Sequence, residues 1–243
     1  MEKSAEIYGI RAVIEAINSK KDIDKVFIQT GLKGKLIGQL ESLIRKNRIN
    51  FSYVPTQKLD RLSKKNHQGV IARICPIKFY DINEFSEIIE KSKIPFILIL
   101  DQISDVRNFG AIIRTAEISG VDGIIIQNSS SAPINSDTVK TSAGAIFNIP
   151  ICKVSHIKDA IYHLHSMDVS IICASEKAEK NIYDVNFKRP VAIVMGSEQK
   201  GINKSILSLS NEMVKLPMFG KIESLNVSVA CGIFLYEVVR QRI

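Results

Sequence analysis

The sequence has few cysteines, no long apolar run and no secretory leader. Its four cysteines, Cys75, Cys152, Cys173 and Cys231, lack paired spacing, which argues against a zinc site or disulfide framework and favours a reducing cytoplasm. The longest apolar run near the middle, residues 94–100, is far short of the ~18–20 residues that span a bilayer. The first six residues include acidic side chains and no apolar stretch. We therefore expect a cytoplasmic protein with no membrane partner.

Composition and charge narrow the class of partner. The chain has 243 residues, 45% of them hydrophobic and 24% charged, which is typical of one large or two small globular domains. Residues 1–80 carry 16 Lys and Arg against 7 Asp and Glu, whereas residues 81–243 carry 17 against 18. A basic first third indicates a polyanionic partner, most often a nucleic acid. A solvated lysine-rich surface accounts for the charge equally well.

Strands and helices alternate in both parts of the chain. The pattern over residues 1–78 predicts a small α/β domain: helix 11–18, strand 25–29, helix 35–46, strand 51–54 and a closing strand 69–74. Residues 79–94 are expected to form a linker with a helix that begins at Asp81. The second domain, 95–243, is predicted to have a parallel sheet with strands at 96–100, 123–126, 169–173, 191–195 and 213–216.

The last helix, about 226–240, is apolar around much of its circumference. This pattern favours burial against a second subunit as well as against its own sheet. Packing on one sheet only is an equal alternative.

Polar, glycine-containing loops follow three of the predicted strands, at residues 101–110, 196–201 and 217–226. The carboxyl ends of parallel strands meet at one sheet edge, so these loops predict a ligand site. Asp101 and Asp105 have no third hard ligand nearby, and no metal is expected. Arg114, one turn into a helix among apolar residues, suits a phosphate or carboxylate. An ion pair with Glu117 is the alternative.

These loops also carry a family resemblance. Residues 108–116 (NFGAIIRTA) resemble the first motif of the SpoU/TrmH family, N-x-G-A-x-x-R-[ST]-A. Residues 194–201 (VMGSEQKG) resemble the second, G-x-E-x-x-G, and 216–218 (LPM) with 224–230 (SLNVSVA) resemble the third. Residues 67–72 (HQGVIA) are similar to the end of the ribosomal-protein-like RNA-binding domain of RlmB-type members. The resemblance covers essentially the whole chain.

The resemblance implies a SPOUT-type fold, in which a deep trefoil knot lies at the carboxyl end of the parallel sheet. It implies S-adenosylmethionine as methyl donor without a metal, a homodimer, and methylation of a ribose 2′-hydroxyl in RNA. RlmB-type members modify a guanosine in the peptidyl-transferase region of large-subunit (23S) ribosomal RNA. Alternatives are a transfer-RNA or resistance methyltransferase of the same family, and a non-catalytic RNA-binding assembly protein, against which the intact motifs argue.

Residue by residue, the resemblance implies two sets of side chains. The expected catalytic set is Arg114, Asn108, Glu198, Ser224 and Asn226. The expected donor-binding set is Gly196, Leu216, Leu225, Met218 and Ala174. The family gives Arg114 the role of base, but the pKa of arginine is above ~12, so we expect it to hold a phosphate and stabilise the developing alkoxide.

Three positions depart from the family pattern. Gln102 stands where Gly is common, and Leu216 stands where Ile is common. Residues 173–175 (CAS) replace a more usual Gly-Thr/Ala turn.

Overall fold

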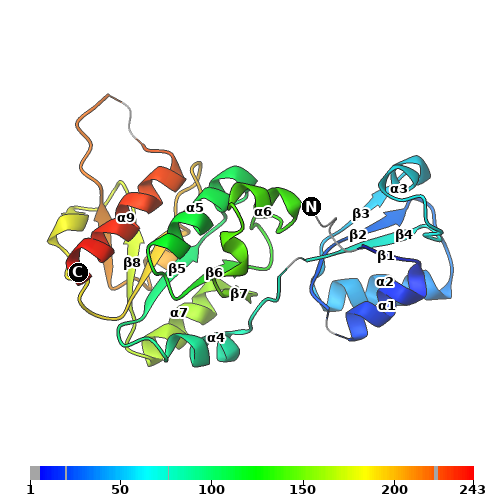
Figure 1. The fold of residues 1–243 in the computed structure, drawn as a ribbon, viewed down its shortest axis with the longest axis horizontal. Helices are drawn as coiled ribbons and strands as arrows, with labels where there is room; N and C mark the ends of the chain where they lie inside the picture. The colour runs from blue at the N-terminus through cyan, green and yellow to red at the C-terminus, as the bar shows by residue number, and fades with distance from the viewer. Residues whose placement is uncertain (1–5, 20, 76, 222–223) are drawn as a thin grey trace. The chain divides into compact units, whose positions relative to one another are not determined.

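A computed structural model of the protein describes residues 6–19, 21–75, 77–221 and 224–243. The chain divides into two compact units (Figure 1). One holds the chain up to Lys78 together with Ile134–Ser136, and the other begins at Phe79 and holds the rest. Each unit has its own sheet and its own hydrophobic core.

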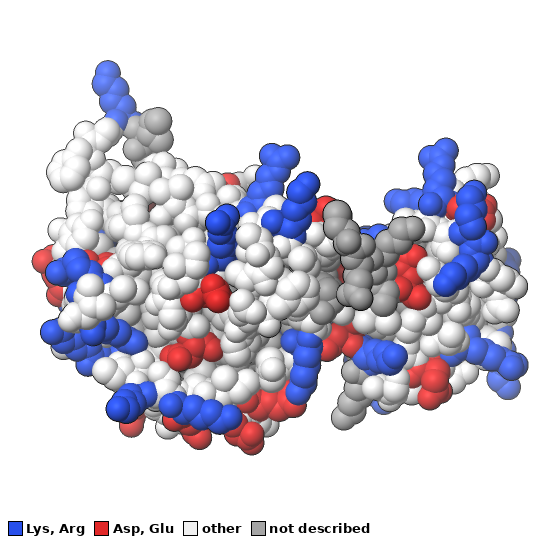
Figure 2. Space-filling view, in the orientation of Figure 1, with Lys and Arg blue, Asp and Glu red and all other residues white. Residues whose placement is uncertain are grey.

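The first unit is a four-stranded sheet in the order β1-β4-β2-β3. Its strands are β1 (Glu6–Tyr8), β2 (Ile23–Gln29), β3 (Phe51–Val54) and β4 (Val70–Ile74). Its helices are α1 (Ile10–Asn18), α2 (Lys35–Lys46) and α3 (Thr56–Leu62). Side chains along β2 point alternately to the two faces of the sheet, so the unit has a separate core on each face. Val26 and Ile28 pack with α1 and α2, whereas Phe27 packs with Leu59 of α3. Lys and Arg side chains project from the visible face of this unit (Figure 2).

The second unit is built on a seven-stranded sheet in the order β7-β6-β5-β10-β8-β11-β9, with every adjacent pair parallel. The strands are β5 (Phe96–Leu100), β6 (Gly123–Gln127), β7 (Ile151–Val154), β8 (Ser170–Ala174), β9 (Lys180–Asn181), β10 (Val191–Met195) and β11 (Glu212–Lys215). All residues of β5 and β10 are buried, as expected for strands covered on both faces. The predicted parallel sheet is confirmed, and the trefoil knot stays a prediction.

Helices cover both faces of this sheet. They are α4 (Ile82–Ile89), α5 (Val106–Ile118), α6 (Ser136–Thr141), α7 (Ile157–Ser166), α8 (Lys204–Leu207) and α9 (Val227–Arg242), with short 3₁₀ turns at Ala145–Phe147 and Ile182–Asp184. One face packs against α4, α7 and α8. Helices α5 and α9 contact each other, and α9 contacts β10 (Figure 1). Within the described residues, no helix is long and apolar enough to cross a membrane.

The segment 79–94, which the sequence assigns to a linker, carries α4. Asp81 caps this helix and shares a capping box with Glu84. Phe85 and Ile89 are fully buried in the core of the second unit, and Tyr80 bridges to Cys152 beside β7. The helix that begins at Asp81 is therefore confirmed, and it packs as part of the second unit. The domain boundaries at 78 and 95 stay a prediction.

The backbone conformation of Gln102 explains why glycine is common at this position in the family. It is the second residue after β5 and has a φ of 60°, in the left-handed region that side chains with a Cβ disfavour. The chain turns sharply here, from the buried strand towards the start of α5. The departure from the family pattern therefore leaves backbone strain at the first loop of the predicted site.

The burial of α4 predicts how substitutions in it act. Phe85→Ala should lower the free energy of unfolding by about 3–5 kcal/mol, because it opens a cavity under the sheet. Glu87, on the exposed side of the same helix, provides the control, and Glu87→Ala should change stability by less than about 0.5 kcal/mol. Urea denaturation measures both values. Equally small effects would show that α4 adds little to the core.

Candidate active site

The chain segments that follow β5 and β10 meet the start of α9 at one edge of the parallel sheet. The first segment leads into α5 through Asp105, and the second is the turn Gly196–Gly201. The third expected loop, 217–226, is described except for residues 222–223. Since parallel strands end at the same edge, segments more than 100 residues apart in sequence come within hydrogen-bond distance.

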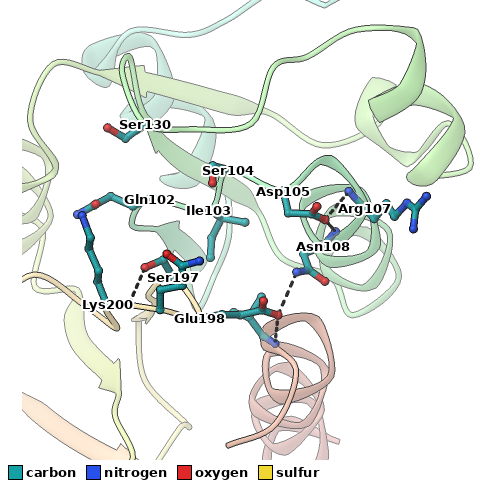
Figure 3. A pocket seen from close by; sticks show the side chains of 12 residues that line it. Gln102, Ile103, Ser104, Asp105, Arg107, Asn108, Ser130, Ser197, Glu198 and Lys200 are labelled. Atoms are coloured by element: carbon teal, nitrogen blue, oxygen red, sulfur yellow. Dashed lines mark hydrogen bonds between the residues drawn. The ribbon is translucent and has the colours of Figure 1, made fainter.

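One carboxylate oxygen joins the three segments (Figure 3). Oε1 of Glu198 accepts hydrogen bonds from Asn108 Nδ2 at 3.0 Å, Asn226 Nδ2 at 2.8 Å and the Val227 backbone N–H at 3.3 Å. Asn226 Nδ2 also donates to Asn108 Oδ1 at 3.0 Å. The predicted polar residues Asn108, Glu198 and Asn226 therefore form one network.

Helix capping orients the two asparagines. Asp105 caps α5, and its Oδ1 accepts from the N–H groups of Arg107 at 2.9 Å and Asn108 at 2.8 Å. Asn226 caps α9 through Oδ1, which accepts from Ser228 N at 3.0 Å. The Nδ2 group of Asn226 is thereby turned towards Glu198. The first turns of both helices thus carry the network.

The turn after β10 requires glycine at position 196. The Gly201 N–H donates to the Ser197 carbonyl at 2.8 Å, which folds the chain back on itself. A Cβ at Gly196 would lie 2.2 Å from the Gly201 carbonyl carbon and 2.3 Å from Ile202 N, so no side chain fits. This close approach presents Gly196 as bare backbone at the edge of the sheet.

Asp101 holds the chain in place just after the Gly196–Gly201 turn. Its Oδ2 accepts from Asn203 N at 2.8 Å, and the residue is only 1% exposed. Burial raises the pKa of this carboxyl group, while the hydrogen bond from Asn203 lowers it. Asp101 and Asp105 both serve the backbone, and among the described residues no group of three His, Cys, Asp or Glu could hold a metal.

Two cavities flank Glu198. The first pocket, about 500 Å³, is lined by Gly196, Ser224, Leu225, Asn226 and neighbours that include Glu176, Lys177 and Ala230. The second pocket, about 560 Å³, is lined by the Gln102–Asp105 segment, Arg107, Asn108 and Ser130. The two pockets share five lining residues: Ser197, Glu198, Gln199, Lys200 and Val227. Glu198 therefore lies in a common wall.

The other predicted residues lie outside these two pockets. Leu216 and Met218 both follow β11, the first buried and the second exposed, and Ala174 is half-buried at the end of β8. Arg114 is exposed on α5 and makes no ion pair within the described part of the chain. The alternative of a salt bridge to Glu117 is therefore absent, and Glu117 instead accepts from Asn148 Nδ2 at 3.4 Å.

Three lining residues lie outside the predicted loops: Ser130, Glu176 and Lys177. Ser104, Arg107 and Lys200 lie within those loops but were not singled out as site residues. Ser130 and Glu176 follow strands β6 and β8, so inspection of the residues after every strand would have found them. Asp105 caps α5, which begins at Val106, inside the segment 101–110 that the sequence predicted as a loop.

Comparison with known proteins places this geometry in a family. Residues 95–236 match the SpoU rRNA methylase family, and residues 7–80 match the substrate-binding domain of RNA 2′-O ribose methyltransferases. The 23S rRNA (guanosine-2′-O-)-methyltransferase RlmB of Vibrio vulnificus is 33% identical over 243 residues, which cover 98% of this chain and 97% of that protein.

Two solved structures share the fold. An AdoMet-bound rRNA methyltransferase from Sinorhizobium meliloti aligns with a TM-score of 0.63 at 22% identity, covering 98% of this chain and 87% of that one. The TrmH/SpoU tRNA modifying enzyme of A. aeolicus aligns with a TM-score of 0.57 at 29% identity, covering 66% and 82%. The family matches together span most of the chain and include both units. The chain belongs to the SpoU rRNA methylase family and is an RNA 2′-O-methyltransferase.

Proposed function

We propose that this protein methylates the 2′-hydroxyl of a guanosine in the peptidyl-transferase region of large-subunit ribosomal RNA. The observation that carries the proposal is the Asn108–Glu198–Asn226 network, set in the wall between two pockets at the carboxyl edge of the sheet. Support for the nucleotide comes from the full-length similarity to a 23S rRNA guanosine-2′-O-methyltransferase. An intact polar network also favours an enzyme over a non-catalytic assembly protein.

The methyl donor is S-adenosylmethionine, whose sulfonium supplies an activated methyl group when bound. The first pocket, which we call the donor pocket from here on, fits such a group. The bare backbone at Gly196 allows close approach, and Leu225 adds an apolar wall. Leu216, Met218 and Ala174 are proposed to complete the adenine surroundings. The chain's own task is to align the ribose oxygen with the methyl group, which is largely a proximity effect.

Arg114 has a different proposed place. It lines neither pocket of its own chain and is exposed on α5. We propose that it reaches the active site of a second copy, where it holds the RNA phosphate and stabilises the developing alkoxide. Its planar, cationic guanidinium suits a phosphate fork better than the role of base. Ser224, in the donor pocket, is proposed to assist at the ribose.

The homodimer that this requires has a candidate surface on α9. Val229 is 52%, Ile233 36% and Tyr236 50% exposed, and their spacing places them along one side of the helix. Val238, by contrast, is fully buried in the protein's own core. A twofold contact through this exposed side would bring α5 of one copy near the site of the other, since α5 and α9 contact each other.

The first unit is proposed to deliver the RNA. It contains most of the basic segment 1–80, with 16 Lys and Arg against 7 Asp and Glu. The turn 67–69 is well supported: Gly69 N donates to His67 Nδ1 at 3.0 Å, and His67 Nε2 lies 3.1 Å from Asp60. Lys64 and Lys65 are exposed beside this turn. Cytoplasmic action fits four cysteines that are all buried as thiols.

Ribosomal RNA tests the proposed target directly. Deleting the gene should remove one 2′-O-methylguanosine from large-subunit ribosomal RNA, and the purified protein with S-adenosylmethionine should restore it. Mapping of ribose methylation by mass spectrometry gives the position. Loss of a methyl group from transfer RNA instead would favour the second candidate, which the likeness to a tRNA modifying enzyme supports.

Mixed dimers test the place of Arg114. Arg114→Ala should lower turnover roughly 10²-fold, the scale for losing a preorganised electrostatic group, and leave donor affinity within a few fold. Glu198→Ala should also lose roughly 10²-fold, because its own network is broken. If Arg114 acts across the interface, co-expression of the two variants creates one intact site per mixed dimer and restores about a quarter of wild-type activity. No recovery would show that Arg114 serves its own chain.

A further inference from the structure

The second pocket lies outside the proposed donor site, and its charged side chains differ in whether they already have partners in the protein. Its two carboxylates already serve the protein, because Asp105 caps α5 and Glu198 accepts three hydrogen bonds. Its two cations, Arg107 and Lys200, make no ion pair within residues 6–19, 21–75, 77–221 and 224–243. The groups left to meet a ligand are therefore predominantly positive.

Hydroxyl groups point to the same kind of ligand. Ser104 and Ser130 line the second pocket, and their side chains make no hydrogen bond with any residue that the structure describes. A hydroxyl can donate to a phosphate oxygen, and a cation beside it adds electrostatic attraction. Figure 3 shows Lys200 extending along one side of the pocket towards Gln102, and Arg107 on the opposite side, with its guanidinium directed outward from the other lining residues.

The position of the pocket identifies which phosphate could bind. Glu198 and Lys200 line both cavities, so a ligand in the second pocket lies directly beside the donor pocket. A volume of about 560 Å³ falls in the range of small-molecule sites and is ample for a nucleotide. A ribose placed at the shared wall would carry its flanking phosphates into the second pocket.

We propose that the second pocket is the acceptor-strand site: it binds the RNA backbone next to the methylated ribose, with Lys200 and Arg107 contacting phosphates at its two sides. The proposal rests on the proposed function, since it assumes an RNA acceptor. It adds two RNA-binding residues outside the sets implied by the family resemblance. The chemistry recognised is a phosphodiester within a strand, together with sugar or base groups that accept from Ser104 and Ser130.

The test compares three single substitutions in the full-length protein: Lys200→Gln, Arg107→Gln and the control Lys204→Gln. Lys204 is exposed on α8 only four residues after Lys200 and lines neither pocket. The probe is whichever unmethylated RNA, isolated from the deletion strain, the wild-type protein methylates. RNA affinity is measured between 0.05 and ~0.3 M salt, and donor affinity is measured by calorimetry.

Each pocket substitution should weaken RNA binding about fivefold or more and make the slope of log K against log salt less negative by about 0.7, the value for one lost phosphate contact with a single strand. Donor affinity should stay within about twofold for Arg107→Gln, because Arg107 lines only the second pocket, and should fall less than RNA affinity for Lys200→Gln, because Lys200 lines both pockets. Lys204→Gln should match wild type in all three measurements. Unchanged slopes for Lys200→Gln and Arg107→Gln would overturn the proposal. A loss of donor affinity as large as the loss of RNA affinity would overturn it as well.

This design separates the two levels of inference. If wild-type protein methylates no RNA from the deletion strain, the proposed function fails. If wild-type protein is active and the pocket variants bind RNA with wild-type affinity and salt dependence, only the acceptor-strand site fails.

Discussion

The site depends on a single carboxylate oxygen that accepts hydrogen bonds from the first turns of two helices. Glu198 Oε1 binds Asn108 at the start of α5 and both Asn226 and Val227 at the start of α9. Asp105 and Asn226 cap α5 and α9 without any help from Glu198. The Glu198 carboxylate instead fixes the start of α5 relative to the start of α9. The wall between the first and second pockets is built from this contact.

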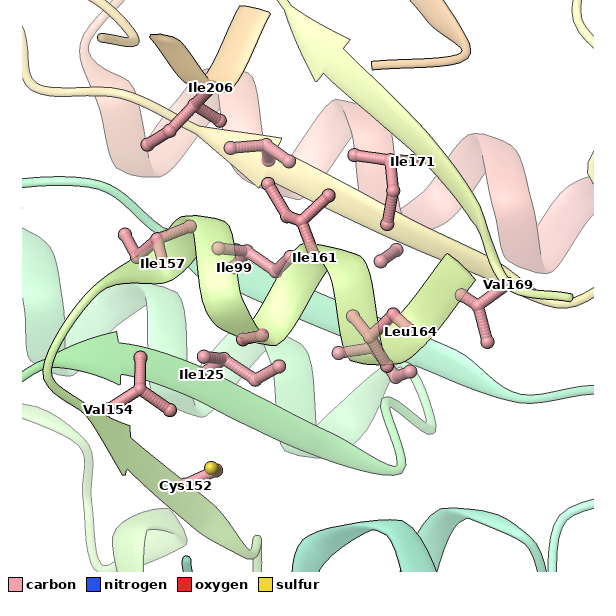
Figure 4. Packing of buried hydrophobic residues seen from close by; sticks show 14 of the residues in the cluster. Ile99, Ile125, Cys152, Val154, Ile157, Ile161, Leu164, Val169, Ile171 and Ile206 are labelled. Carbon is pink, nitrogen blue, oxygen red and sulfur yellow. The ribbon is translucent and has the colours of Figure 1, made fainter. Parts of the chain in front are cut away.

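A rigid scaffold makes such a small contact effective. Hydrogen bonds to a charged group contribute only about 1.5–3 kcal/mol each, so the network alone could not hold three segments in place. Below it, the strands are buried on both faces, and α7 packs its apolar side across them (Figure 4). The tight turn at Gly196 and the buried Asp101 then hold the Glu198 segment against this layer. Precision at the site comes from the core beneath it.

Much of this arrangement could be predicted from sequence, for identifiable reasons. Continuous apolar runs located the buried strands such as Phe96–Leu100, and the loops that follow them located the site. The motifs then indicated Asn108, Glu198 and Asn226, which the structure brings together. Periodicity could not show that Phe85 of the expected linker is a core residue, because burial depends on what the helix meets. Nor could it show that Arg114 faces away from its own pockets.

Substitution of Glu198 by Gln and by Ala tests the central claim most directly, because it separates positioning from charge. Glutamine keeps one side-chain oxygen that can accept the same three hydrogen bonds, whereas alanine keeps none. If Glu198 acts by holding the two helix starts, Glu198→Gln should retain single-turnover methylation within about tenfold of wild type. Glu198→Ala should lose roughly 10²-fold, the cost of a misplaced reacting geometry. Equal inactivity of both variants, with normal donor affinity, would contradict the account and assign the carboxylate's charge or proton to the reaction itself.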